Sequence, residues 1–124
     1  VTTRNAVNTS YFSTTSYSYV SVTNVSFTLS NISGGKCMLG ISGKLYHYSI
    51  NFSIYAALFE GSTQQSEIGY SVNSDHANGK HWGAVAGTHA CNLSGQTIYL
   101  KIYKGTGSSS ATCWYGKLSG LEVS

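Results

Sequence analysis

The sequence alternates between apolar and polar residues with a period of two over one continuous stretch. Six apolar or aromatic side chains occupy every second position from Tyr46 to Ala56, and most residues between them are polar. A helix would need apolar residues three and four positions apart. A period of two instead places alternate side chains on opposite faces of a β-strand. We therefore predict a single strand over residues 46–56 with one apolar and one polar face.

Shorter segments show the same alternation and are separated by turn-forming residues. Further strands are predicted around residues 17–22, 25–30, 38–41, 97–103 and 118–123, the last with an irregularity at Gly120. Turns are predicted at residues 33–36, 60–62, 78–79, 93–96 and 105–110. This spacing predicts an all-β fold without helices, an antiparallel β-sandwich or jelly roll of about eight strands.

Composition supports one globular domain and excludes several other classes. Ser, Thr, Asn and Gly account for 55 of the 124 residues, charged residues for 9% and aromatic residues for 13%, and there is no Pro. A helical bundle needs far more Ala, Glu, Lys and Leu, and a disordered chain carries fewer aromatic residues. No apolar run approaches the roughly 20 residues of a membrane helix, so we expect no membrane insertion.

The polar N-terminal segment differs from the rest of the chain. Residues 1–15 are too polar to hold structure alone, so we expect them to pack on a neighbour or to link the domain to a larger body. We predict an N-terminal arm or anchor over residues 1–12 and a head domain over residues 13–124.

The charge pattern argues against nucleic-acid binding and against catalysis. The net charge is +3, the seven basic residues are scattered singly, and Arg4 is the only arginine. Nucleic-acid binding would favour a basic stripe or cluster. Glu60 and Glu67 flank one predicted loop and resemble the carboxylate pair of a glycosidase, but we favour a solvated loop. No Gly-x-Ser-x-Gly motif is present. We predict no enzymatic activity and no cofactor, and keep a small hydrolase as a minor alternative.

The cysteines and histidines show no diagnostic metal-binding spacing. Three cysteines cannot all pair within one chain. They are interpreted either as small buried strand residues or as including a single bridge such as Cys91–Cys113. His76 and His81 lie around a predicted turn and have Asp75 beside them, but no ligand spacing there is typical of a metal site.

The segment 75–82 is the strongest candidate for ligand binding. It places His76, Lys80, His81 and Trp82 on one predicted loop. Exposed aromatic rings beside hydrogen-bonding side chains are typical of contacts with sugars or proteins. The alternative is that Trp82 belongs to the core or to a subunit contact. Trp114, near residues 105–110, is a second candidate with the same alternative.

Several segments resemble known domains when taken in order. Residues 11–29, with the run T-S-Y-S-Y-V-S-V followed by an alternating apolar strand, resemble the opening of jelly-roll domains in phage and other viral surface proteins. Residues 33–43 and 115–123 resemble the next element and the closing strand of those domains. Residues 43–49 and 93–103 are similar to elements of the globular heads of the complement and tumour-necrosis-factor superfamily, with Gln96 in place of the usual Asp.

The resemblance covers residues 11–124 and implies a head that binds rather than reacts. It implies a homotrimer at the virion surface, as a phage or viral tail fibre, a spike tip or a capsid decoration. The expected partners are other virion proteins, through residues 1–12, and a host-surface glycan or protein. The alternative function is a stand-alone carbohydrate-binding module or lectin, with Trp82 or Trp114 as the stacking platform.

Overall fold

The computed structural model describes residues 1–47, 52–65, 70–74, 81–106 and 110–124. These residues form ten strands, and the described part of the chain contains no helix. The strands are β1 (Thr2–Val7), β2 (Tyr11–Thr14), β3 (Val20–Thr28), β4 (Asn31–His47), β5 (Phe52–Glu60), β6 (Thr63–Gln64), β7 (Tyr70–Ser74), β8 (His81–Ser94), β9 (Thr97–Thr106) and β10 (Ala111–Val123).

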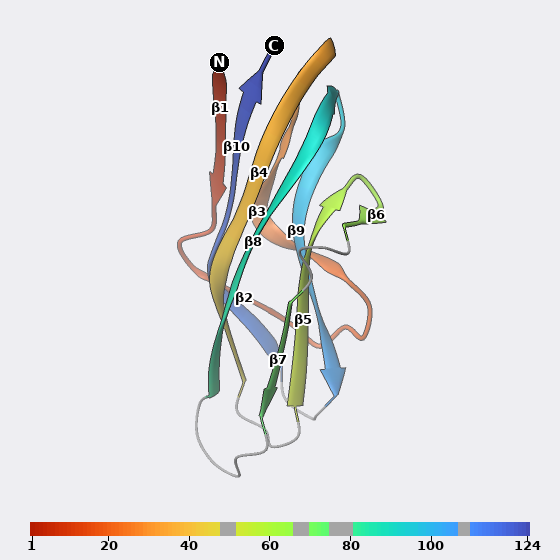
Figure 1. Ribbon diagram of the computed structural model, residues 1–124. Coiled ribbons are helices and arrows are strands. Elements are labelled where there is room, and N and C mark those ends of the chain that lie inside the picture. The colour runs from red at the N-terminus through yellow and green to blue at the C-terminus, as the bar shows by residue number, and fades with distance from the viewer. Residues whose placement is uncertain (48–51, 66–69, 75–80, 107–109) are drawn as a thin grey trace.

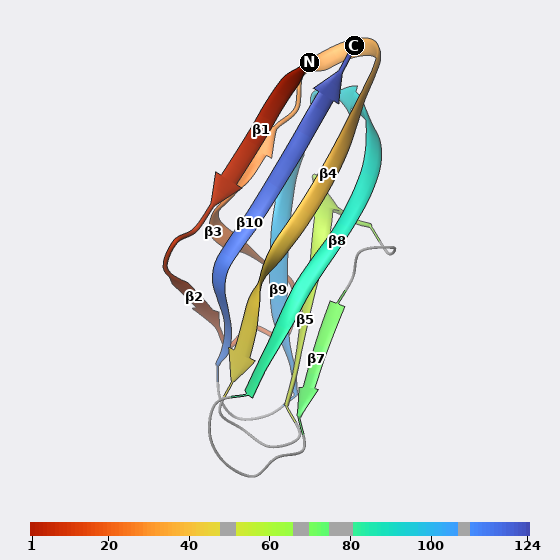
Figure 2. The ribbon, with the colours of Figure 1, turned by 60° about the vertical axis from the view of Figure 1, so that its left-hand side comes forward.

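The strands form two sheets that lie face to face (Figures 1 and 2). Sheet A has the order β1-β10-β4-β8, with β2 also paired to β10, and sheet B has the order β3-β9-β5-β6, with β7 also paired to β5. All of these pairings are antiparallel. The predicted all-β antiparallel sandwich is confirmed. The structure has ten strands rather than about eight. Two separate strands, β1 and β2, pair with β10, and the two-residue β6 counts as a strand of its own.

The pairing of strands is nested along the sequence. β1 pairs with β10, β3 with β9, β4 with β8, and β5 with β7. Early strands therefore pair with late strands, and the innermost pair lies near the middle of the chain. Such a long folded hairpin, wrapped into two sheets, is the jelly roll found in viral capsid and lectin domains. The N- and C-terminal ends lie side by side as a result (Figure 1).

The two sheets enclose one apolar core. Strand β9 shows the alternation clearly, because Ile98, Leu100 and Ile102 are each 0% exposed while Tyr99 and Lys101 between them are half-buried. The core also contains residues of β3, β4, β5 and β10: Val22, Val25, Leu39, Leu45, Ile54, Leu58 and Leu118. Burying alternate side chains of every strand removes their apolar area from water, which is the main stabilising contribution to such a fold.

The single strand predicted over residues 46–56 is wrong. Tyr46 lies near the end of β4 in sheet A, whereas β5 begins at Phe52 in sheet B. Residues 48–51 lie outside the described residues. Leu45, not Tyr46, belongs to the core face of β4, whereas Ile54 and Ala56 contribute to the core from β5. The alternation therefore joins the outer face of one strand to the core face of the next, and the pattern alone does not reveal the change of sheet.

Two predicted irregularities are also placed differently in the structure. The turn predicted at residues 33–36 lies inside β4, where the register shifts and Gly34 adopts a φ of +78°. The irregularity of β10 lies between Trp114 and Lys117, not at Gly120. Gly120 instead allows close packing of Phe27, because a Cβ atom at this position would lie only 3.2 Å from Cζ of Phe27.

The N-terminal residues take part in sheet A. Residues Thr2–Val7 form β1 and pair with β10, and β2 begins at Tyr11. The anchoring role of residues 1–12 and the domain boundary at residue 12 stay predictions.

Candidate functional site

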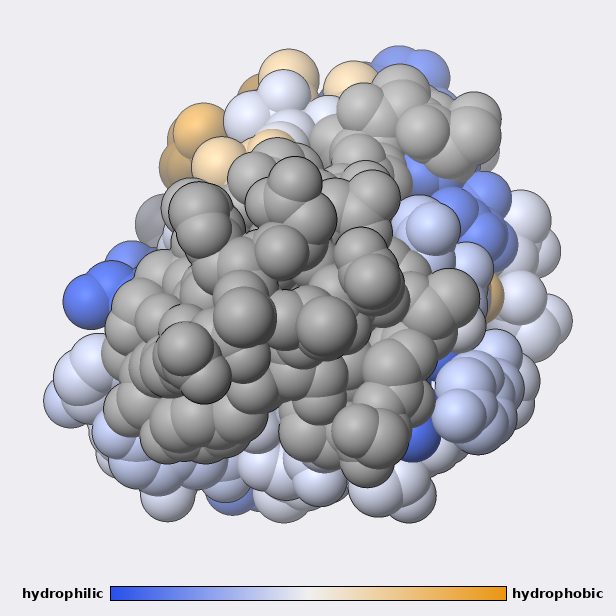
Figure 3. Space-filling model, turned by 90° about the horizontal axis from the view of Figure 1, so that it is seen from below, coloured by the Kyte–Doolittle hydropathy of each residue, from blue (hydrophilic) through white to orange (hydrophobic). Residues whose placement is uncertain are grey.

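The predicted binding segment lies only partly within the described residues. His76 and Lys80 fall outside the described residues. His81 and Trp82 begin β8, where their backbones pair with His47 and Tyr46 of β4. Figure 3 views this end of the sandwich, and the described surface visible around it is mainly hydrophilic, with a few hydrophobic residues on one side. The proposed binding role of these four residues stays a prediction.

An aromatic cluster lies on sheet A next to the same end. Its members are Tyr11 of β2, Trp114 and Tyr115 of β10, and Tyr46 and Lys44 of β4. The rings of Tyr11 and Trp114 are stacked, with centroids 5.3 Å apart and an interplanar angle of 18°. Tyr46 meets Tyr11 edge-on at 5.7 Å, and Tyr115 meets Trp114 edge-on at 5.1 Å. These are the offset and edge arrangements that aromatic pairs favour.

The cluster combines a buried base with exposed rings. Tyr46 is 8% exposed, whereas Tyr11 is 51% and Tyr115 is 48% exposed. Register explains the arrangement, because Trp114 pairs with Tyr11 on one side and with Lys44 on the other. Directly opposed residues of neighbouring strands share one face of a sheet. The cluster therefore presents two aromatic rings to solvent on a rigid sheet.

A β-bulge directs the aromatic residues of β10 outward. The register of β10 against β4 shifts between Trp114 and Lys117, and Tyr115 adopts a φ of +54°. This left-handed conformation is unfavourable for a residue with a side chain, and bulges often redirect side chains beside functional sites. The bulge interrupts the alternation, so that Trp114 is half-buried and Tyr115 is exposed before Gly116 returns to the core.

The connection between β1 and β2 is fixed to this bulge. The backbone N–H of Asn8 donates to the carbonyl oxygen of Gly116 at 2.9 Å. The side-chain oxygen of Asn8 accepts a hydrogen bond from the backbone N–H of Ser10, also at 2.9 Å. This local turn leads directly into Tyr11. The position of the Tyr11 backbone therefore depends on the bulge beside which its ring stacks.

The cluster carries positive charge. The Lys44 ammonium lies 4.9 Å from the centroid of the Trp114 ring, within the range of a cation–π interaction. An aromatic surface bearing a lysine suits a ligand with flat apolar faces and hydroxyl or carboxylate groups.

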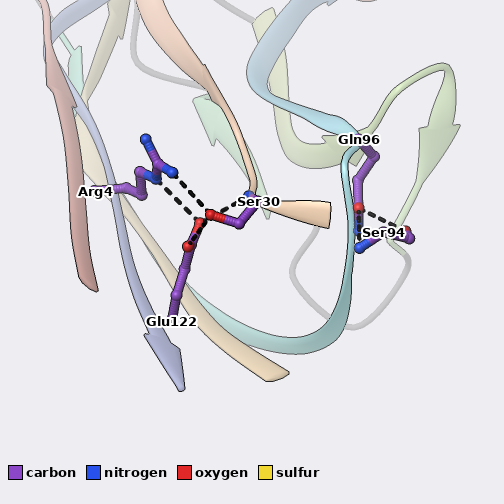
Figure 4. A network of polar contacts seen from close by, with 5 residues as sticks. All are labelled: Arg4, Ser30, Ser94, Gln96 and Glu122. Carbon is purple, nitrogen blue, oxygen red and sulfur yellow. Dashed lines mark hydrogen bonds and ion pairs between the residues drawn. The ribbon is translucent and has the colours of Figure 1, made fainter. Parts of the chain in front are cut away.

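A buried carboxylate ties three distant segments together (Figure 4). Glu122 of β10 accepts hydrogen bonds from Arg4 Nε at 3.0 Å, from the Ser30 backbone N–H at 3.1 Å and from Ser30 Oγ at 2.6 Å. Its side chain is 4% exposed. The hydrogen bond from Ser30, together with Arg4, holds the pKa of Glu122 below its usual value, although burial acts in the opposite direction. Both carboxylate oxygens are occupied, so this network fits a structural role.

Gln96 organises the turn between β8 and β9 (Figure 4). Its side-chain oxygen accepts hydrogen bonds from the backbone N–H of Ser94 at 3.1 Å and from Ser94 Oγ at 2.6 Å. Gly95 between them has a φ of +78°, which a glycine adopts without steric cost. Gln96 thus holds this turn at the position where the resembling family usually has Asp.

The other predicted chemistry is not assembled in the described residues. Glu67 lies outside the described residues, and Glu60 contacts His89 Nε2 at 2.9 Å. The three cysteines are free, and β8 and β10, which carry Cys91 and Cys113, are not neighbours. Within residues that the structure describes, no group of three or more His, Cys, Asp or Glu side chains is arranged to hold a metal ion, and no helix is long and apolar enough to cross a membrane.

Sequence reasoning found part of the aromatic cluster and missed the rest. Trp114 was a second binding candidate, but Tyr11, Tyr46 and Lys44 were not singled out. The cluster is formed by three strands that are far apart in sequence, β2, β4 and β10, and only the register brings them together. The sequence contains one indication of the position of Tyr11. It directly follows the polar residues 8–10, which is typical of an aromatic residue at the start of an edge strand.

Comparisons with known proteins reveal a likeness of fold. No protein-family model and no curated protein matches the chain. The structure of infectious bursal disease virus Gx strain is similar with a TM-score of 0.55 and 14% identity, over 96% of this chain and 32% of that chain. The Gt strain structure gives a TM-score of 0.49 and 17% identity over 95% and 31%. The crystal structure of the infectious bursal disease virus VP2 subviral particle gives 0.47 and 21% over 95% and 32%.

The chain therefore spans about a third of the length of each matched chain. The resemblance to phage heads and to complement and tumour-necrosis-factor heads stays a prediction. What the comparisons establish is that nearly the whole chain has a fold similar to one part of a virus structure.

Proposed function

We propose that this chain is a non-enzymatic structural component of a virus particle, exposed at the particle surface as a fibre tip, spike tip or capsid decoration. The observation that carries the proposal is the nested jelly-roll topology, shared over 96% of the chain with the structure of infectious bursal disease virus Gx strain. Jelly rolls recur in viral capsid proteins and in lectins. The step from fold to function is an argument by analogy.

The proposal includes assembly into a homotrimer attached through residues 1–12. β1 lies at one end of the strand order of sheet A, so its outer edge offers backbone hydrogen-bonding groups to another chain. Symmetric packing would cover such an edge. Light scattering of the purified chain should give three times the mass of one chain, and a monomer at working concentration would contradict this part of the proposal.

The virion location is tested on particles. Antibodies raised against residues 1–124 should label the surface of purified particles from the source of this sequence in immunogold electron microscopy. Labelling should persist after washing at high salt. A chain that accumulates in infected or producing cells but is absent from purified particles would contradict a structural role in the virion.

We further propose that the aromatic cluster binds a host-surface glycan. Tyr11 and Tyr115 offer exposed rings, and aromatic rings pack against the apolar faces of sugars. Lys44 adds a positive charge beside them, which favours glycans that carry a carboxylate. Each site is small and weak, and three copies in a trimer would raise the overall avidity.

Binding is tested on a glycan array with matched variants. Tyr11→Ala and Lys44→Gln should each weaken binding by roughly tenfold, equivalent to about 1.4 kcal/mol. Tyr17→Ala is the control, because Tyr17 is 65% exposed and lies outside the cluster. Equal loss in all three variants, or no binding by the unmodified protein, would refute glycan binding at this cluster.

The second candidate function is a stand-alone carbohydrate-binding module or lectin. The same exposed rings favour it, and jelly rolls include lectins. A free lectin should bind sugar as an isolated monomer and should be absent from particles. Comparison of Trp82→Ala with Tyr11→Ala locates the sugar, since loss of binding in Trp82→Ala with full binding in Tyr11→Ala would place it on the 75–82 segment.

A further inference from the structure

Two cysteines face each other across sheet A. Cys37 of β4 and Cys91 of β8 are direct register partners in an antiparallel ladder. Opposed Cα atoms in such ladders are roughly 4.5 or 5.5 Å apart, and both spacings fall in the range of about 4.4–6.8 Å that disulfides span. The two thiols are hydrogen-bonded to each other and both are free.

We propose that Cys37 and Cys91 form a cross-strand disulfide when the protein meets an oxidising environment. The bond would join the inner strand β4 covalently to β8, at the end of the strand order of sheet A. The inference rests on the pairing of the thiols alone and is independent of the function proposed above.

The third cysteine has no such partner. Cys113 pairs in register with Phe12 and Leu45, and it is 1% exposed in the core. The register partner of Cys37 on β10 is Glu122. The register therefore selects one pair among the three that are chemically conceivable, and Cys113 serves as an internal control.

Cys91 is the more accessible of the two thiols. It is half-buried and lies on β8, at the end of the strand order of sheet A, whereas Cys37 is only 2% exposed. A small oxidant should therefore react first at Cys91.

The oxidant is a low-molecular-weight disulfide such as oxidised glutathione. The Cys91 sulfur, after losing its proton, attacks one sulfur of the oxidant, and one glutathione thiolate leaves. The Cys37 sulfur, also deprotonated, then attacks the Cys91 sulfur of this mixed disulfide, and the second glutathione thiolate leaves. The two protons lost by the cysteines end on the two glutathione thiols. Two protein thiols are oxidised to one disulfide, and one glutathione disulfide is reduced.

Burial and nearby carboxylates make this reaction slow at neutral pH. Burial, followed by the nearby Glu60 carboxylate and Cys37, raises the pKa of Cys91 to about 12. Burial and then Glu122 raise the pKa of Cys37, while Arg4 acts in the opposite direction. The Glu60 side chain is also hydrogen-bonded to His89.

Because the thiolate is the attacking species, the initial rate should rise about tenfold for each pH unit between 7 and 9. Glu60→Gln should accelerate the reaction, since it removes a negative charge beside Cys91. If Glu60 had a purely structural role, Glu60→Gln would not increase the oxidation rate in this pH range.

The decisive experiment uses the unmodified full chain. It is prepared with reductant, incubated with oxidised glutathione at pH 8.5, unfolded in denaturant with excess alkylating agent, and digested for mass spectrometry. We expect a linked peptide pair containing Cys37 and Cys91, with Cys113 alkylated. Oxidation should also raise the melting temperature, on the order of 10 °C for a loop of this length, and dithiothreitol should reverse the shift.

Two variants sharpen the outcome. Cys113→Ser should still form the bond at the same rate, and Cys37→Ser should stop at the mixed disulfide of Cys91 with glutathione. Circular dichroism checks that both variants are folded. Three alkylated cysteines after prolonged oxidation, or a linked pair that contains Cys113, would overturn the proposal.

Discussion

Replacing Glu122 with glutamine should destabilise the sandwich at neutral pH by about 2 kcal/mol. The carboxylate accepts three hydrogen bonds, from Arg4 Nε and from the backbone and side chain of Ser30. A hydrogen bond to a charged group contributes roughly 1.5–3 kcal/mol. Glutamine keeps only one acceptor oxygen and has no charge. It therefore keeps the hydrogen bonds at one of the two oxygen positions, in weaker form, and loses the hydrogen bond at the other. The Arg4 side chain is 34% exposed, so solvent screens its share of the loss.

The same substitution should change how stability depends on pH. The folded-state pKa of Glu122 lies below its ordinary value of 4.5, so its contribution is fully present above about pH 4.5. That contribution is lost as the pH falls through the lower folded-state pKa, because the unfolded state then binds the proton first. The difference between the unmodified protein and Glu122→Gln should therefore shrink steadily below pH 4.5.

Urea unfolding followed by circular dichroism at several pH values between 7 and 3 measures both effects. Lys117→Gln is the control on the same strand, since Lys117 is exposed, and its effect should stay within about 0.5 kcal/mol. Glu122→Ala should be worse, by roughly a further 1–3 kcal/mol, because alanine also removes the acceptor oxygen that glutamine keeps and leaves the hydrogen-bonding groups of Ser30 without this partner. The assay resolves differences of about 0.5 kcal/mol. A smaller difference between the unmodified protein and Glu122→Gln, or a difference that stays constant across pH, would refute the reasoning.

Three further changes probe the core, the bulge and the outer face of sheet B. Ile102→Ala, at a site that is 0% exposed, should lower the free energy of unfolding by about 2–5 kcal/mol in urea melts. Gly116→Ala should lower it by about 1–3 kcal/mol, because the new Cβ would lie 3.2 Å from Sγ of Cys113; an unchanged midpoint would contradict this packing. Burial raises the pKa of Tyr19 to about 12, so stability should fall as the pH rises from 10 to 12, and Tyr19→Phe should show less of this fall in thermal melts.

The fold class could be predicted because the alternation of apolar and polar residues within a strand indicates which of its residues are buried. Alternating residues such as Ile98, Leu100 and Ile102 specify a face directly, and every strand turns that face to the same core. The connectivity could not be predicted from the same signal. Tyr46 and Ile54 fall on one alternation although Tyr46 lies on the outer face of sheet A and Ile54 lies in the core from sheet B, because a period of two does not specify which face of a strand is buried.

The candidate site could be predicted only where one strand contains it. Trp114 and Tyr115 are adjacent in sequence, so the sequence alone places these two aromatic residues together. Tyr11 and Lys44 join them through a register that depends on where β10 bulges. That bulge requires a left-handed Tyr115, and no sequence rule predicts an aromatic residue in that conformation.

The nested pairing has a consequence for biosynthesis. Sheet A has β10 between β1 and β4, so the sheet cannot close until residue 123 has left the ribosome. Contacts that join the start of a chain to a segment more than a hundred residues later form slowly. Until then β4 and β8 can pair only with each other, which leaves the second edge of β4 open to other nascent copies. A ribosome stalled before β10 should therefore release an aggregation-prone hairpin, and dense polysomes translating this message should need chaperones.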